Sequence, residues 1–309
     1  MVVDAFEPPE PVANVPLTCA PGSLKAEPGS CGCEVPDDDF DGDGAADCVD
    51  ACPDNPAGTV PSGACGCSDY ADTNSCGELR AAIRNLYTFD GEGTEVVDSV
   101  SGANGTVQHE LAPAPTALDS VQRSGRLILD GQGSYVDLPD GLISTLGDAT
   151  FEAWVIWRGG GIWARIFDFG DNEGTPYEGV TYLFLTSDAG TGLRAAYSVA
   201  GPQQETRANG SVPLPVHIEP DDNTPDQVAV VFDRTNASMR LYSNGVEIGS
   251  QGAPLDLGAI NDVNNWLGRS NYLVDPPLSA TLIEFRVYSR ALTPAQLGAS
   301  YQAGPGALD

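Results

Sequence analysis

An aspartate-rich stretch near the N-terminus constrains the fold of this chain more than any other feature. Aspartates crowd residues 37–50, with no lysine or arginine among them. Counted from Asp39, carboxylates fall at positions 1, 3, 5, 9 and 12, a glycine at position 6 and a backbone carbonyl ligand at position 7. With this spacing a single loop surrounds Ca²⁺ with oxygen atoms, whereas a solvated acidic loop would need no such register. The predicted ligands are Asp39, Asp41, Asp43, the Ala45 carbonyl, Asp47 and Asp50.

All the cysteines of the chain lie in the same region. They are Cys19, Cys31, Cys33, Cys48, Cys52, Cys65, Cys67 and Cys76. An even number of cysteines in an acidic, Pro- and Gly-rich segment favours disulfides, and therefore an oxidising compartment. Zinc is the alternative. It is disfavoured because the close pairs have CxC rather than CxxC spacing, no histidine is near, and carboxylates suit harder cations.

Charge and hydropathy exclude several function classes. The formal net charge of −30 over 309 residues argues against binding to nucleic acid or to an anionic membrane surface. No apolar run approaches the roughly 18 residues that a membrane span needs. The first residues lack the charged and apolar regions of a signal peptide, so an exported form would have lost its signal. Residues 1–18 are Pro-rich and predict an extended arm, docked either on its own domain or on a neighbouring molecule.

The segment that follows the arm contains an imperfect repeat. Cys19 with Cys31-Gly-Cys33 returns as Cys52 with Cys65-Gly-Cys67. Together with the run DFDGDGAADCVDACPDNP at 39–56, it resembles thrombospondin type 3 repeats. The resemblance implies calcium-dependent folding, little regular secondary structure and an extracellular location. The repeat suggests sequential disulfides, although sequence alone does not fix the pairing: Cys19–Cys31, Cys33–Cys48, Cys52–Cys65 and Cys67–Cys76.

From about Leu79 the sequence changes to short apolar runs separated by Gly, Asn, Asp and Pro. Such runs predict an all-β, antiparallel two-sheet sandwich or jelly roll. Asn244-Gly245 between two runs predicts a hairpin turn, and 293–301 predicts a short capped helix with Pro294 at its start. One helical turn is expected at 80–86. The expected strands are 85–89, 126–129, 135–138, 150–157, 165–169, 182–185, 193–199, 227–232, 239–243, 246–248, 265–267 and 280–288.

The same region carries a series of family landmarks. Among them are Leu129-Asp130-Gly131, Phe151-Glu-Ala-Trp154, Trp266-Leu-Gly268-Arg269 and the closing Tyr288-Ser-Arg290-Ala-Leu292. Over about residues 80–303 the chain resembles laminin G-like domains of the concanavalin A-like lectin/glucanase superfamily. The resemblance implies a jelly roll with binding sites on rim loops or the concave face, and frequently a structural calcium. Loop aspartates could supply its ligands but are more typical of turns: Asp98, Asp130, Asp168, Asp171, Asp221 and Asp222.

No catalytic constellation accompanies this resemblance. The Glu-x-Asp-x-Glu strand motif of glucanases is absent, and the nearest string, 219–223, lies among prolines and lacks the last glutamate. His109 and His217 are isolated and are expected at the surface. We therefore expect a binding protein, not an enzyme. Aromatic residues at strand ends or in Gly/Pro-rich loops are candidates for stacking on sugars, with core packing as the alternative: Trp157, Trp163, Tyr177 and Tyr272.

The sequence thus predicts three parts: an arm (1–18), a thrombospondin type 3-like calcium and disulfide segment (19–78), and a laminin G-like sandwich (79–309). The expected function is calcium-dependent adhesion or recognition outside the cell. Its partner would be a glycan or an extracellular protein, with no nucleic acid and no membrane insertion. One alternative is a structural subunit of a filament, appendage or surface layer that self-associates through the arm. A degenerate glycoside hydrolase is the other.

Overall fold

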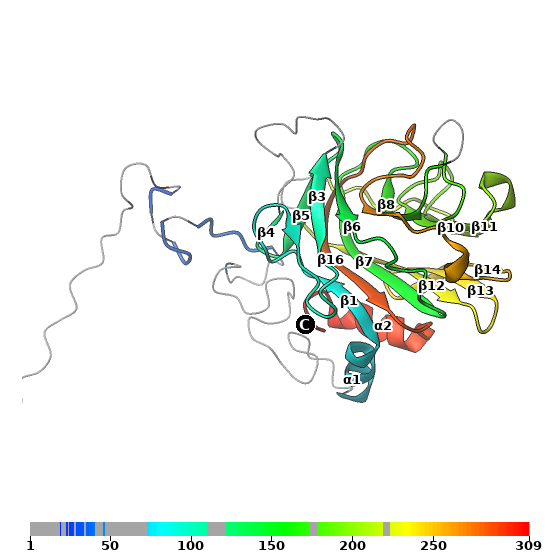
Figure 1. The fold of residues 1–309 in the computed structure, drawn as a ribbon. Coiled ribbons are helices and arrows are strands. Elements are labelled where there is room, and N and C mark those ends of the chain that lie inside the picture. The colour runs from blue at the N-terminus through cyan, green and yellow to red at the C-terminus, as the bar shows by residue number, and fades with distance from the viewer. Residues whose placement is uncertain are drawn as a thin grey trace, which may run out of the picture.

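The computed structural model describes residues 19, 23, 25–27, 29–33, 35–40, 46, 73–109, 122–173, 178–218 and 223–308, with 73–77 and 123 as backbone alone. Over these residues the chain forms two antiparallel sheets packed face to face, with few helices (Figure 1). The predicted fold class, an all-β antiparallel two-sheet sandwich of the jelly-roll kind, is confirmed. The predicted arm at 1–18 lies outside the described residues.

Sheet A has the strand order β14-β13-β12-β7-β16-β5-β4, and β1 also pairs with β16. Its strands are β1 (Ile83–Tyr87), β4 (Gln122–Arg123), β5 (Arg126–Asp130), β7 (Ala149–Trp157), β12 (Asp226–Asp233), β13 (Ser238–Ser243), β14 (Val246–Gly252) and β16 (Ser279–Tyr288). The β13–β14 hairpin turns through Asn244 and Gly245, both at positive φ, as the sequence predicted.

Sheet B has the order β11-β10-β9-β8-β15-β6-β3-β2. Its strands are β2 (Glu95–Val96), β3 (Gly105–His109), β6 (Ser134–Leu138), β8 (Arg165–Gly170), β9 (Tyr182–Thr186), β10 (Arg194–Ser198), β11 (Thr206–Asn209) and β15 (Asn264–Leu267). Two short 3-10 helices, η1 (Pro202–Gln204) and η2 (Leu257–Ala259), lie in its connections.

The inner faces of the two sheets enclose the main hydrophobic core. In β9, for example, Leu183 and Leu185 join this core, whereas Tyr182 and Phe184 belong to a separate cluster on the outer face. The alternation follows from the two-residue period of a strand. Strands β8 and β9 of sheet B and β7 of sheet A are buried on both faces. The outer face of sheet A is therefore covered at β7.

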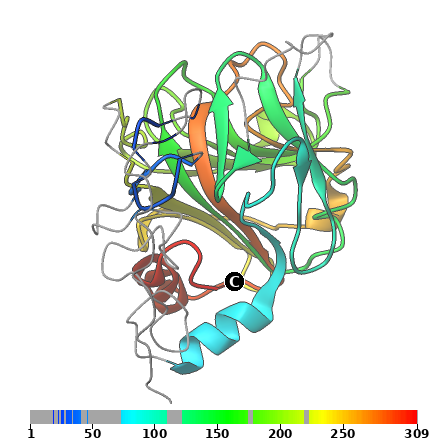
Figure 2. The same cartoon turned by 90° about the vertical axis from the view of Figure 1, so that its left-hand side faces the viewer.

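Helices α1 (Thr73–Ala82) and α2 (Pro294–Ala303) provide that cover (Figures 1 and 2). Leu79 of α1 and Leu297 of α2 pack in a second core with residues of β12, β13 and β16. The α2 helix begins with the predicted cap, since Thr293 and Gln296 form a reciprocal capping box. The prediction of a helical turn at 80–86 is wrong beyond Ala82, where α1 ends and the chain continues as β1. The boundary drawn between residues 78 and 79 falls inside α1.

The described part of the disulfide segment corrects the predicted pairing. Cys19 is bonded to Cys33, so the predicted pairs Cys19–Cys31 and Cys33–Cys48 are wrong. Backbone hydrogen bonds explain the choice: Cys19 N donates to Ala26 O at 2.9 Å, and Lys25 N donates to Cys33 O at 3.3 Å. Cys19 and Cys33 are thus both hydrogen-bonded to the neighbouring residues Lys25 and Ala26. Their Cα atoms lie 5.5 Å apart. Cys31 is also disulfide-bonded.

Phe40 attaches this segment to the sandwich. Its ring is 7% exposed and packs with Trp154, Ile156 and Ile283 on the outer face of sheet A. The guanidinium carbon of Arg126 lies 3.4 Å from the centre of the ring, a cation–π contact. Asp39, the first predicted calcium ligand, precedes Phe40 and is exposed. No helix among the described residues is long and apolar enough to cross a membrane.

Candidate carbohydrate-binding face

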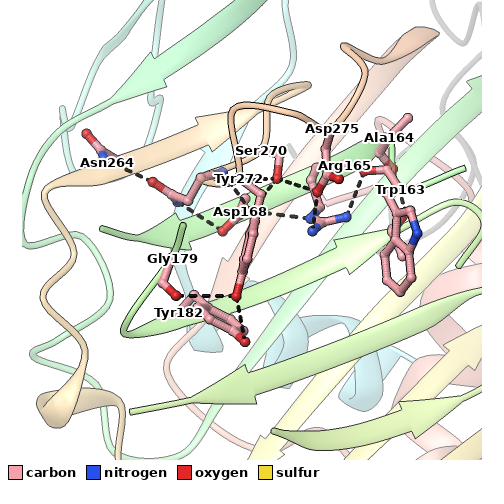
Figure 3. Close-up of polar contacts among 12 residues, drawn as sticks. Trp163, Ala164, Arg165, Asp168, Gly179, Tyr182, Asn264, Ser270, Tyr272 and Asp275 are labelled. Carbon is pink, nitrogen blue, oxygen red and sulfur yellow. Dashed lines mark hydrogen bonds and ion pairs between the residues drawn. The ribbon is translucent and has the colours of Figure 1, made fainter. Parts of the chain in front are cut away.

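The outer face of sheet B carries a continuous set of polar and aromatic side chains. Strand register places Arg165 beside Thr186, Asp168 beside Phe184, and Ala196 beside both Phe184 and Arg207. All of these residues point away from the core, because cross-strand partners share a face of the sheet. These side chains therefore share one face of sheet B across β8, β9, β10 and β11, which we call the outer face. All of them except Arg207 are buried. Part of it is drawn in Figure 3.

A buried ion network forms the base of this face. Arg165 is 2% exposed and uses its whole guanidinium group: Nε donates to Asp168 Oδ2 at 3.3 Å, Nη1 to the Trp163 carbonyl at 2.7 Å, and Nη2 to Asp275 Oδ2 at 2.8 Å. Asn271 also donates to Asp168, through N at 3.0 Å and Nδ2 at 2.9 Å, and Ser270 Oγ donates to it at 3.4 Å. Burial raises the pKa values of Asp168 and Asp275 above the ordinary range, although Arg165 opposes the rise. The network ties β8 to the loop 270–275.

Aromatic rings surround this base. The Arg165 guanidinium carbon lies 3.9 Å from the Phe184 ring centre and 5.6 Å from that of Trp163. Tyr272 packs edge-on against Tyr182 with centroids 5.7 Å apart, and their hydroxyls lie 3.1 Å from each other. Burial raises the pKa of Tyr272 to about 12, so this phenol stays protonated as a donor. Trp163 and Tyr272 are both half-buried, and each therefore keeps part of its surface open to solvent.

Trp163 is held in an unusual backbone conformation. Its φ is +73°, in the left-handed region that a bulky residue rarely adopts. Two hydrogen bonds hold it there: its N–H donates to Asp188 O at 2.7 Å, and its carbonyl accepts from Arg165. Strain of this kind persists where the surroundings fix it, often at binding sites. The backbone of Trp163 is thus held in place, and its ring packs against the cluster of Tyr182, Phe184 and Ala196.

Hydrogen-bonding groups line the edge of the face on β10 and β11. Arg194 Nε donates to Asn209 Oδ1 at 2.6 Å, and its guanidinium carbon is 5.3 Å from the Trp163 ring centre. Glu205 accepts from Tyr182 and pairs with Arg207. A planar ring beside a row of donors and acceptors is an arrangement that can hold a sugar: the ring stacks on C–H groups and the polar groups bind hydroxyls.

A second aromatic cluster lies on the same face over β6 and β15. Arg269 lies over both Tyr135 and Trp266, with its guanidinium carbon 4.6 and 4.3 Å from the two ring centres. The Trp266 indole donates to Asp137 Oδ1 at 2.9 Å. Strand β8 joins the two clusters, since Trp266 pairs with Asp168. The outer face thus extends across the sheet from β11 to β6.

The four aromatic candidates from the sequence have different outcomes. The structure brings Trp163 and Tyr272 together at the same site. Trp157 is 5% exposed and belongs to the main core, and Tyr177 lies outside the described residues. Sequence reasoning missed Arg165 and Arg194, and it expected Asp168 in a loop, whereas Asp168 lies inside β8. The only local signal for them is that each occupies an outward position in a strand that also carries an aromatic residue.

The loop aspartates of the sandwich are occupied by protein donors. Asp98 accepts from Asn85 Nδ2 at 2.8 Å and from Leu86 N at 3.0 Å, and Asp171 accepts from Thr181 Oγ1 at 2.6 Å. These contacts favour the turn role over the ligand role. Within the described ranges no three His, Cys, Asp or Glu side chains are grouped to hold a metal. Of the predicted calcium ligands only Asp39 is described; Asp41, Asp43, Ala45, Asp47 and Asp50 lie outside.

One histidine does not lie where the sequence predicted. His217 is buried at 9% exposure, and its Nε2 is 3.0 Å from Asp226 Oδ2. The expectation of a surface position is wrong, because the 213–218 segment packs against β7: His217 N donates to the Trp157 carbonyl at 2.8 Å. The expectation that the protein is not an enzyme stays a prediction.

Comparison with known proteins places the sandwich in a family. Residues 130–298, more than half of the chain, match Laminin_G_3, described as the concanavalin A-like lectin/glucanases superfamily. The match does not reach residues 19–78, so their resemblance to thrombospondin repeats stays a prediction. No curated protein matches the sequence.

Two solved structures share the fold. Domain 4 of AbnA, a GH43 extracellular arabinanase from Geobacillus stearothermophilus in complex with arabinotriose, aligns with a TM-score of 0.53 at 22% identity, over 70% of this chain and 96% of that one. A Trypanosoma rangeli sialidase in complex with sialic acid aligns with a TM-score of 0.52 at 16% identity, over 72% of this chain and 33% of the sialidase. The alignments agree with the sheet topology and with the family match. The chain belongs to the concanavalin A-like lectin/glucanases superfamily.

Proposed function

We propose that this protein is a secreted or cell-surface recognition protein that binds carbohydrate on the outer face of sheet B. One observation carries the proposal: Trp163 and Tyr272 are half-buried on either side of the fully paired Arg165 network, beside the polar edge of β10 and β11. The AbnA domain, which has the same fold, is in complex with arabinotriose. That complex supports the proposal by analogy.

The physical basis is a rigid site. Arg165 and Asp168 fix the base, the Tyr272 hydroxyl is hydrogen-bonded to Gly179 and Tyr182, and the Trp163 ring packs against the cluster of Tyr182, Phe184 and Ala196. Little side-chain entropy is therefore lost when a ligand binds. The protein already covers part of the Trp163 and Tyr272 rings. A bound sugar therefore displaces water only from the part of each ring that faces solvent.

Replacing Trp163 by alanine is expected to weaken carbohydrate binding about tenfold to hundredfold, because a ring at the centre of a site commonly contributes about 2 kcal/mol or more. A glycan array identifies a ligand for the wild-type chain, and titration calorimetry measures both proteins. Tyr301→Ala is the control. That aromatic residue is 39% exposed but stacks on Trp154, on the sheet A side. A wild-type chain that binds no glycan, or a folded Trp163→Ala variant with unchanged affinity, would refute the proposal.

We also propose that residues 39–50 bind Ca²⁺ through Asp39, Asp41, Asp43, the Ala45 carbonyl, Asp47 and Asp50. The donor set supports this proposal, since carboxylates and a carbonyl are the ligands that calcium prefers. So does the exposed position of Asp39 next to the docked Phe40. Adhesion, self-association through the arm and a degenerate hydrolase stay predictions from the sequence.

Changing Asp43 and Asp47 together to asparagine is expected to weaken calcium binding by at least about a hundredfold, because affinity depends on the charge of the ligands. Calorimetric titration of the full chain with CaCl₂ measures the effect. Glu92→Gln, at an exposed carboxylate of the sandwich, should leave calcium binding unchanged. If the double variant binds calcium as tightly as the wild-type chain, the proposed ligand set is wrong.

A further inference from the structure

Positive charge is scarce in this protein, yet arginines gather on one surface. The chain has 14 basic residues against 44 acidic ones. Four of the arginines, at positions 165, 194, 207 and 269, contact the residues of the outer face of sheet B. In a chain of net charge −30, these cations offset part of the repulsion that an anionic group would otherwise meet at this face.

The arginines of the outer face differ in how they are neutralised. Arg165 pairs with both Asp168 and Asp275 and is fully used. Arg207 is paired with Glu205 through its Nε atom. Arg194 has no carboxylate within ion-pair distance among the described residues, and its one hydrogen-bond acceptor is the neutral amide oxygen of Asn209. Arg194 is thus a cation of this face that no carboxylate contacts directly in the described part of the chain.

The geometry of Arg194 leaves one edge of its guanidinium group open. Nε is occupied by Asn209 and one side of the group faces the Trp163 ring. Nη1 and Nη2 have no acceptor in the described part of the chain, and the side chain is half-buried. Two parallel N–H groups on one edge match the two oxygens of a carboxylate. Burial, and then the nearby Arg207, lower the pKa of Arg194, and the nearby Glu205 opposes them only in part.

We infer that the outer face of sheet B selects acidic glycans, with the sugar carboxylate bound by the Nη1–Nη2 edge of Arg194 and the sugar ring stacked on Trp163. Uronic acids and sialic acids both carry this carboxylate beside a ring. The inference rests on the proposed carbohydrate function and names the substrate class of the same site.

The test compares each acid with its own methyl ester, which keeps the sugar and removes the charge. Oligogalacturonate and sialyllactose serve as probes, so the two sources of a carboxylate are distinguished. Titration calorimetry on the full chain should show at least one acid binding at least about tenfold more tightly than its ester. In Arg194→Gln this ratio should fall to about one. Arg194→Lys keeps the positive charge but lacks the two parallel N–H groups of the guanidinium, so it should give an intermediate ratio.

Controls separate this inference from the function on which it rests. Trp163→Ala should weaken acid and ester alike, and Arg290→Gln, at an exposed arginine beyond β16, should change neither. Circular dichroism melting shows that each variant is folded. Equal affinity of the wild-type chain for acid and ester, or binding of neutral glycans only, would overturn the acidic preference while the carbohydrate function stands. Absence of binding to any glycan would overturn both.

Discussion

Replacing Arg286 by methionine is expected to lower the free energy of unfolding by about 3–5 kcal/mol, because breaking a buried ion pair leaves an uncompensated buried charge. Arg286 is fully buried between sheet A and α2. It pairs with Glu284 and donates to Glu152 Oε2 at 3.1 Å and to Ser300 Oγ at 3.0 Å. Burial alone would lower the pKa of Arg286, but the nearby carboxylates outweigh it and raise that pKa. The side chain is therefore charged in the folded state.

The size of the effect follows from the composition of this network. Glu152 also accepts from Tyr288 at 2.7 Å, and Glu284 accepts from Gly306 N at 2.7 Å. Two buried carboxylates thus share one cation, and without Arg286 both lose their countercharge.

Urea denaturation measures the loss, with an unchanged slope showing that the folded state is otherwise intact. Arg290→Met, at an exposed arginine of the same segment, should cost less than about 0.5 kcal/mol. A loss below about 1 kcal/mol for Arg286→Met would show that the network is not the main connection between α2 and sheet A.

The sandwich could be predicted from sequence because its strands carry their own signals. Each predicted strand range overlaps a strand, and the Asn244-Gly245 turn and the Thr293 cap depend on local chemistry. The missed strands lack such a signal. Strand β3 buries one large apolar side chain, Val107, and β11 buries only Ala208. They form because the neighbouring strands β6 and β10 supply backbone partners.

The candidate site could be predicted only in part. Trp163 and Tyr272 lie at the site, and aromatic residues in Gly/Pro-rich loops pointed to them. The network beneath them joins β8 to the loop 270–275, and no local pattern shows that Arg165 meets a partner 110 residues later. The disulfide error has a similar origin. The Cys19–Cys33 bond depends on backbone hydrogen bonds at Lys25 and Ala26, which the cysteine spacing does not reveal.

Replacing Arg165 by methionine is expected to lower the free energy of unfolding by about 3–5 kcal/mol near neutral pH and to abolish measurable carbohydrate binding. The change leaves Asp168, which is fully buried, without its countercharge. It also removes the donor to the Trp163 carbonyl and the link to Asp275. Both aromatic walls of the site then lose their support. Arg234→Met is the control, since it breaks only an exposed pair with Asp256 and should cost less than about 1 kcal/mol.

The pH dependence of this variant separates a charge effect from a packing effect. Burial already raises the folded-state pKa of Asp168, and loss of Arg165 should raise it further. A carboxyl whose pKa is higher in the folded state than in the unfolded state stabilises the fold when it is protonated. That contribution is fully present below the unfolded pKa, near 3.8, and is lost as the pH rises through the folded pKa. The stability deficit of Arg165→Met relative to the wild-type chain should therefore narrow as the pH falls from about 8 to about 5. Urea titrations of both proteins across this range measure the deficit; a constant value would mean that lost packing, not the unpaired Asp168 charge, causes the destabilisation.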